Sequence, residues 1–114
     1  MGEKQVSVTF EDHSQEVLDT MKGAILHGLE RCGLQAEGYA KDLCPVDTGN
    51  LRNSISHVVD TEKEDAAYIG TNVEYAPYVE LGTKKQKAQP FLKPAVTDHA
   101  QTYKNIMEDE LKNA

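Results

Sequence analysis

The sequence predicts an α+β fold in which a long N-terminal helix and a C-terminal helix pack on a small, mainly antiparallel β-sheet. Apolar residues recur at helical spacing over residues 17–43 and again over 95–111, which indicates one helix near each end. Two short runs between them alternate apolar with polar residues, as strands do. The 114 residues, 39% of them hydrophobic, suit a single domain over 1–114 with one modest core.

The first segment, Gln5 to Phe10, alternates valine and phenylalanine with polar residues and predicts a half-buried edge strand. Asp12 or Ser14 can then cap the long helix. Pro45 ends this helix, because the residue before a proline avoids helical dihedral angles. Its apolar positions follow the helical period: Val17, Leu18, Met21, Ile25, Leu29, Cys32, Ala36, Tyr39, Ala40 and Leu43.

Four glycines interrupt this helix, which would be about 40 Å long. Each glycine costs about 1 kcal/mol relative to alanine, so propensity alone does not hold the helix together. Two explanations stay open. The helix breaks near Gly33 and Leu34, or the glycines allow close packing against the sheet or a neighbouring subunit, which is the preferred explanation.

A turn and a hairpin follow the helix. Asp47 can hydrogen-bond the backbone two residues on, and Gly49 permits a positive φ, so the segment around Thr48 predicts a turn. Residues 54–59 and Ala66 to Thr71 alternate as strands on either side of a polar turn, which predicts a β-hairpin.

The last third predicts one short and one longer helix. Residues 73–81 contain a proline and predict a helical turn that ends at Gly82 as its C-cap, with its tyrosines facing the first helix. A final helix begins near Pro94, because proline is tolerated at a first helical position. We interpret His99 on its apolar face as a core residue rather than a ligand. That face consists of Ala95, Val96, His99, Tyr103, Ile106, Met107 and Leu111.

Three blocks of this chain resemble a known family. They are Pro45 to Ile55, Tyr75 to Thr83 and Gln89 to Ala95. In this order they are similar to the small neck or tail-completion proteins of long-tailed bacteriophages, which join the DNA-filled head to the tail. The resemblance covers residues 43–96, and its most specific parts are the tyrosine block and the proline-rich block.

The resemblance implies a structural virion protein of the head-tail joint, present in the host cytoplasm during assembly. Its subunits would associate as a ring around the DNA channel. The implied partners are further copies of the chain, the connector or stopper proteins, and the tail terminator or tail-tube proteins. A free-standing dimeric binding or regulatory module of a phage or mobile element remains the alternative function.

Charge and composition exclude several other functions. A net charge of −7 and a pI near 5.0 argue against wrapping DNA, because nonspecific duplex binding depends on clustered Lys and Arg. We expect DNA to pass nearby without specific binding. Cys32 and Cys44 would lie about 18 Å apart on one helix, too far for a disulfide. The histidines are scattered, so we expect no metal and no cofactor. No apolar run reaches the length of a membrane span or resembles a signal peptide.

No residue pattern favours an enzyme. The triplet Asp47-Thr48-Gly49 matches the active site of aspartic proteases, whose chemistry needs two aspartates that share a proton. Here it follows Pro45 and precedes polar Asn50, which favours the turn over the protease interpretation. The nearby serines at 54 and 56 are strand neighbours of a histidine without an oxyanion motif.

The candidate functional residues are therefore partner-binding residues at a subunit interface. Tyrosine side chains with one carboxylate could form a ligand pocket, but core or interface packing is the preferred interpretation. The lysine cluster is a solvated loop, a contact to an acidic neighbouring subunit or, least favoured, a nucleic-acid contact. We hypothesise that it pairs with the acidic face of the last helix. The set is Asp47, Thr48, Tyr75, Tyr78, Glu80, Lys84, Lys85, Lys87, Glu108, Asp109 and Glu110.

Overall fold

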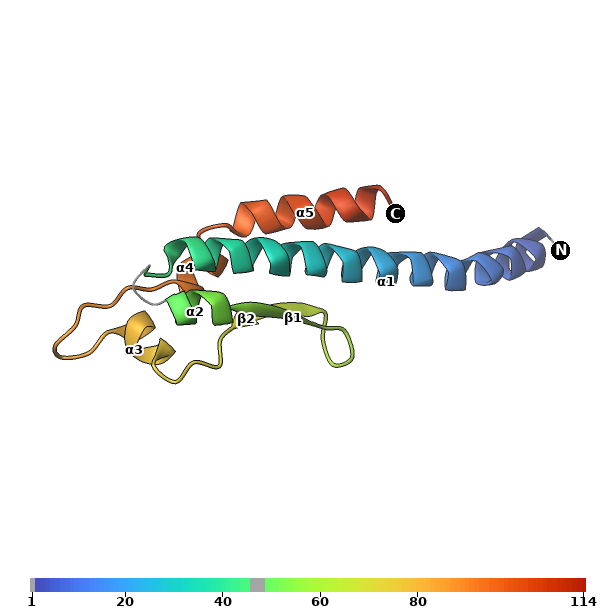
Figure 1. The fold of residues 1–114 in the computed structure, drawn as a ribbon. Coiled ribbons are helices and arrows are strands. Elements are labelled where there is room, and N and C mark those ends of the chain that lie inside the picture. Colours follow the sequence, from blue (N-terminus) through green and yellow to red (C-terminus); the bar gives the residue numbers. More distant parts are fainter. Residues whose placement is uncertain (1, 46–48) are drawn as a thin grey trace.

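The computed structural model describes residues 2–45 and 49–114, with side chains from residue 15 onward. Helix α1 is the central element, with α5 packed along one side and the β-hairpin along the other (Figure 1). The predicted α+β class is confirmed. The elements are α1 (Gly2–Leu43), α2 (Gly49–Ser54), β1 (Ser56–Asp60), β2 (Ala66–Gly70), α3 (Ala76–Leu81), α4 (Leu92–Thr97) and α5 (Ala100–Lys112).

The molecule is elongated, with principal extents of 76 × 23 × 21 Å. Its radius of gyration is 20.0 Å, whereas a compact domain of this length would have a radius of about 13 Å. The difference arises because the N-terminal half of α1 extends past both the hairpin and α5 (Figure 1). Much of α1 therefore lacks a covering layer within its own chain.

The strand predicted at Gln5 to Phe10 is wrong, since α1 already begins at Gly2. The caps predicted at Asp12 and Ser14 are wrong for the same reason. The physical cause is that Val6 and Phe10 stand four residues apart, so they continue the apolar spacing of the helix behind them. A period of two over six residues carries too little information to override that helical pattern.

Helix α1 runs without interruption through Gly33 and Leu34, so the predicted alternative of a break is wrong. Close packing explains two of its glycines. A Cβ atom at Gly28 would lie 2.5 Å from Met107 Sδ of α5, and one at Gly33 would lie 2.7 Å from His57 Cδ2 of β1. Glycine lets both neighbours approach the helix backbone.

The predicted hairpin is confirmed. Strands β1 and β2 pair antiparallel, with Ser56 opposite Gly70 and Asp60 opposite Ala66. The predicted turn at Asp47 and Thr48 lies outside the described residues. The positive φ expected at Gly49 is wrong, because this glycine opens α2, and among the described glycines Gly82 has a positive φ.

The core is small and lies where the end of α1 meets α2, α3 and α4. Phe91 and Leu51 are its large, fully buried side chains. Much of the remaining core consists of small residues, which lets the elements pack closely but buries limited apolar area. The core residues are Ala40, Cys44, Leu51, Ile55, Ala76, Phe91 and Ala95.

The prediction of a single C-terminal helix from Pro94 is wrong in one respect, because this part of the chain forms two helices, α4 and α5. Its start is shifted by two residues to Leu92, and the chain turns at Asp98 and His99. The His99 ring stacks on Tyr39 of α1 with centroids 3.5 Å apart, which agrees with the packing role predicted for this histidine. No glycine or proline marks the turn, so the sequence pattern appears continuous there.

Candidate assembly surface

Helix α3 lies near one end of the molecule (Figure 1), and half of its side chains, those of Pro77, Tyr78 and Leu81, are exposed. The exposed fractions are 37% for Tyr75, 61% for Tyr78 and 77% for Leu81. The expectation that the tyrosines face α1 is wrong. Ala76 and Val79 occupy the inward face instead, because they stand three residues apart on a helix of only six residues. The aromatic rings are therefore available to a partner.

The carboxylate of Glu80 has an internal role. It accepts hydrogen bonds from the backbone N–H groups of Phe91 (3.0 Å), Leu92 (2.9 Å) and Lys93 (3.2 Å). These are donors that the first turn of α4 leaves without helical partners. Glu80 thus fixes the start of α4 against α3. The sequence gives no signal for this contact, because the partners are 11 to 13 residues away.

Residues 83–89 form a loop that we call the lysine loop. It begins after Gly82, whose φ of 79° and ψ of 174° are nearly restricted to glycine. Thr83 and Gln86 exchange backbone hydrogen bonds, and Gln89 N–H donates to the carbonyl of Val79 at 2.8 Å. The three lysines of the loop, at positions 84, 85 and 87, are exposed, and no described residue forms an ion pair with them.

Replacing Glu80 by glutamine should lower the free energy of unfolding by about 1–3 kcal/mol. The variant loses charge-assisted hydrogen bonds. Its amide NH₂ group would also face a backbone N–H group, from which it cannot accept a hydrogen bond. Urea denaturation followed by circular dichroism would measure the change. Glu74→Gln, an exposed glutamate shortly before α3, is the matched control and should leave stability unchanged. Equal stability of both variants would show that the Glu80 carboxylate does not hold the start of α4.

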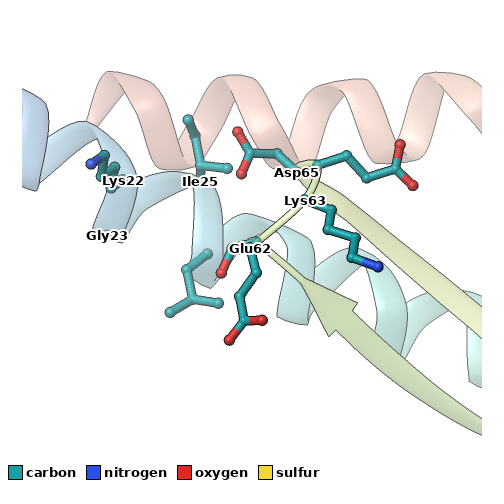
Figure 2. A pocket seen from close by; sticks show the side chains of 9 residues that line it. Lys22, Gly23, Ile25, Glu62, Lys63 and Asp65 are labelled. Atoms are coloured by element: carbon teal, nitrogen blue, oxygen red, sulfur yellow. The ribbon is translucent and has the colours of Figure 1, made fainter.

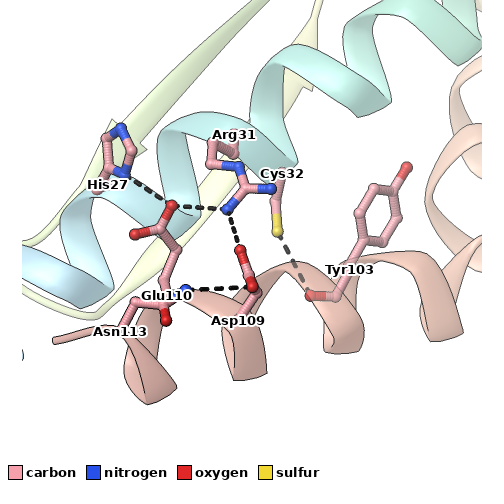
Figure 3. Close-up of polar contacts among 7 residues, drawn as sticks. All are labelled: His27, Arg31, Cys32, Tyr103, Asp109, Glu110 and Asn113. Atoms are coloured by element: carbon pink, nitrogen blue, oxygen red, sulfur yellow. Dashed lines mark hydrogen bonds and ion pairs between the residues drawn. The ribbon is translucent and has the colours of Figure 1, made fainter.

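The acidic face predicted on α5 is partly used within the chain (Figure 3). Arg31 of α1 donates to Asp109 at 3.1 Å and to Glu110 at 2.7 Å, and His27 Nδ1 lies 2.7 Å from Glu110 Oε1. Hydrogen bonds from His27 and Arg31 hold the pKa of Glu110 below its ordinary value. Glu108 is exposed and lies 3.9 Å from Lys104. Two of the three carboxylates therefore attach α5 to α1.

Cys32 and Tyr103 complete the contact between α1 and α5 (Figure 3). The Cys32 thiol donates to the Tyr103 carbonyl oxygen at 3.7 Å, and burial raises the pKa of this thiol. The Tyr103 hydroxyl donates to the carbonyl of Ala95, and burial raises its pKa to about 12. Both groups stay neutral near pH 7, so neither is a poised nucleophile or base.

A second polar cluster joins α1 to the sheet. The Nδ1 atom of His57 lies 3.1 Å from Glu37 and its Nε2 atom 3.3 Å from Glu30. Two carboxylates facing both ring nitrogens favour the doubly protonated ring. Hydrogen bonding to Glu37 and then to Glu30 raises the pKa of His57, and hydrogen bonding to His57 and Lys41 lowers the pKa of Glu37.

This cluster predicts a pH-dependent stability. The folded-state pKa of His57 exceeds the ordinary 6.5, so its stabilisation is complete below pH 6.5 and is lost as pH rises through the folded value. The folded-state pKa of Glu37 lies below the ordinary 4.5, so its stabilisation is present above pH 4.5 and is lost on acidification. The pair stabilises most between pH 4.5 and 6.5.

Urea denaturation from pH 5 to 8.5 would measure this effect. The wild-type protein should lose stability across the alkaline half of the range, and His57→Gln should remove that part of the slope. His27→Gln, which affects a more exposed histidine, serves as the comparison. An unchanged slope in His57→Gln would show that the cluster does not titrate as described.

A hollow of about 520 Å³ lies between α1 and the hairpin turn (Figure 2). Lys22, Gly23, Ile25 and Leu26 line it from α1, and residues 61–65 line it from the turn. Its carboxylates belong to exposed turn residues, and the described chain contains no cluster of three or more potential metal ligands. The hollow marks the point where the hairpin stops covering α1.

Beyond this point α1 continues as an uncovered helix, which we call the arm (residues 2–22). Three of its apolar side chains are exposed: 54% for Val17, 50% for Leu18 and 45% for Met21. The apolar face predicted along the helix is buried or half-buried from Ile25 to Ala40, whereas it is exposed at Val17, Leu18 and Met21 and again at Leu43. A second exposed surface thus lies at the opposite end of the molecule from α3 and the lysine loop (Figure 1).

The candidate residues are thus divided among separate places. Tyr75, Tyr78 and the lysine loop share one end, whereas the acidic residues of α5 lie beside α1. Sequence reasoning missed the exposure of the arm, which an apolar helical pattern alone does not reveal. None of the described helices is long and apolar enough to cross a membrane.

The chain matches the model of a protein family. The model is that of the HK97-gp10-like family, described as "Bacteriophage HK97-gp10, putative tail-component", and it matches residues 4–82. No curated protein and no solved structure matches the chain. The matched segment contains nearly all of α1, the hairpin and α3, and it ends just before the lysine loop. Because the match covers more than half of its length, this chain belongs to the HK97-gp10-like family of phage tail components.

Proposed function

We propose that this chain is a structural, non-enzymatic subunit of the phage head-tail joint. Its copies associate as a ring around the DNA channel and connect the head connector to the tail tube. The family match supports a tail role. The ring is supported by one observation in particular: apolar side chains are exposed in two separate places of an elongated molecule, on α3 at one end and on the part of α1 that extends past the hairpin.

A ring of identical subunits needs two different, complementary faces on each copy. The arm and the end that carries α3 and the lysine loop would serve as these faces, because they lie apart in the molecule (Figure 1) and differ in charge. Exposed tyrosines suit an assembly surface, since the aromatic side chain packs against a partner while its hydroxyl group stays hydrated at the rim. A net charge of −7 allows DNA to pass through the centre without being held.

Cryo-electron microscopy of phage particles that encode this chain would test the proposal. We expect the chain as a symmetric ring between the connector or stopper and the tail terminator or tail tube. Absence from intact particles, together with a defined dimer in solution that binds no tail or connector protein, would overturn it. That result would favour a regulatory module instead.

A further inference from the structure

We propose that adjacent copies join through a contact between the arm of one copy and the α3 end of the next. The α3 end comprises residues 75–93, including α3 and the lysine loop. This inference rests on the proposed ring-forming function and names the two surfaces that meet. The partner is a second copy of this chain.

The arm presents the continuation of a face that is buried farther along α1. Val17, Met21, Ala24 and Gly28 follow one another at spacings of four, three and four residues, so they share one side of the helix. Met107 of α5 lies over Gly28, and Ala24 is buried. No described element of the same chain covers Val17 and Met21 in this way, because α5 ends at Lys112.

The α3 end offers an apolar surface with a fixed backbone. Leu81 and Tyr78 are 77% and 61% exposed, and they stand next to the lysine loop. Glu80 holds the start of α4, and Gly82 and Gln89 fix the two ends of the loop. An apolar patch rimmed by charge is typical of a protein-binding surface.

The charges of the two surfaces are opposite. The sequence of the arm, residues 2–22, contains five carboxylates and two lysines, which gives −3. Residues 75–93 contain four lysines and one carboxylate, which gives +3, and that carboxylate belongs to Glu80, which faces backbone N–H groups. Arm against arm, or loop against loop, would bring like charges together. Arm against loop is therefore the favoured pairing.

The contact is heterologous, because it uses different surfaces of the two copies. The surfaces lie at opposite ends of the long axis, so each copy keeps one of them free for another neighbour (Figure 1). Such contacts repeat around an axis and close into a ring when the rotation allows it. The acidic residues Asp109 and Glu110 are less suited to this contact, since they already pair with Arg31.

Charge reversal in the full-length chain would test the contact. Lys84→Glu, Lys85→Glu and Lys87→Glu together should raise the concentration needed for self-association by on the order of 100-fold or more, because acidic surfaces then face each other. Glu16→Lys with Asp19→Lys should have a similar effect. The variant that carries all five changes restores opposite charges and should assemble again. Sedimentation velocity would measure mass, and circular dichroism would verify folding.

Matched controls change the same charge elsewhere. Lys63→Glu, Lys104→Glu and Lys112→Glu match the lysine-loop variant, and Glu62→Lys with Asp65→Lys matches the arm variant; both controls should assemble normally. Normal assembly of the lysine-loop variant, failure of the folded five-change variant to recover, or a wild-type chain that stays monomeric up to millimolar concentration would overturn the contact. Reversal and recovery as expected, with the chain missing from phage particles, would support the contact but overturn the proposed function.

Discussion

Phe91→Ala will lower the free energy of unfolding by about 3–5 kcal/mol. Phe91 is fully buried, and together with Leu51 it supplies the large side chains of a core otherwise rich in small residues. Removing its ring leaves a cavity that neighbours such as Ala40, Ala76 and Ala95 are too small to fill. Domains are typically stable by only about 5–15 kcal/mol, so this loss brings the fold near its limit.

Urea denaturation monitored by circular dichroism at 222 nm would measure this effect. Leu81→Ala is the matched control, because Leu81 is 77% exposed and its truncation should change stability by less than about 0.5 kcal/mol. A loss below about 1 kcal/mol for Phe91→Ala would show that the core is organised around other residues. Phe91→Leu, which keeps most of the volume, should lie between the two.

Gly82→Ala will destabilise the protein and displace the lysine loop. The φ of 79° and ψ of 174° lie in a region that is nearly restricted to glycine, and strain there costs on the order of 1–3 kcal/mol. An added Cβ atom would also lie 2.7 Å from the backbone nitrogen of Ala88. Backbone atoms cannot move aside as a flexible side chain can, so we expect a cost at the upper end of that range.

Gly23→Ala is the matched control, because it makes the same glycine-to-alanine substitution at another position. Gly23 is helical and has no described atom within 4 Å of an added Cβ, so alanine should stabilise α1 by about 0.5–1 kcal/mol. The two substitutions should therefore have opposite signs in the same denaturation assay. Hydrogen exchange over residues 83–89 should also become faster in Gly82→Ala, and unchanged exchange and stability would contradict the argument.

The features that were predicted correctly are those that the local sequence determines without tertiary contacts. Pro45 ends a helix whatever surrounds it, the alternation on both sides of residues 61–65 specifies a hairpin, and Gly82 suits a helix C-cap. The strand prediction for Gln5 to Phe10 failed because the apolar residues of this segment fit both the strand period and the helical period. The longer helix that follows determines which of the two structures forms. The turn at Asp98 and His99 depends on packing against Tyr39, which no local pattern encodes.

The candidate surface was predictable in composition but not in orientation. Lys84, Lys85 and Lys87 stand in a polar loop and are exposed, as expected for such a segment. Tyr78 was assigned the wrong side because a helix of six residues is too short to define an apolar face. The partners of Glu110 lie 79 and 83 residues away, so only the three-dimensional structure shows that this carboxylate is used internally.

The clamped backbone around the lysine loop has an entropic consequence for assembly. Binding a flexible loop would require its backbone dihedral angles to be fixed at the moment of contact, which weakens affinity. Here the bonds from Thr83 to Gln86 and from Gln89 to Val79 have fixed them during folding. Only the lysine side chains still lose freedom when a partner arrives, so more of the attraction between the surfaces is retained as binding free energy.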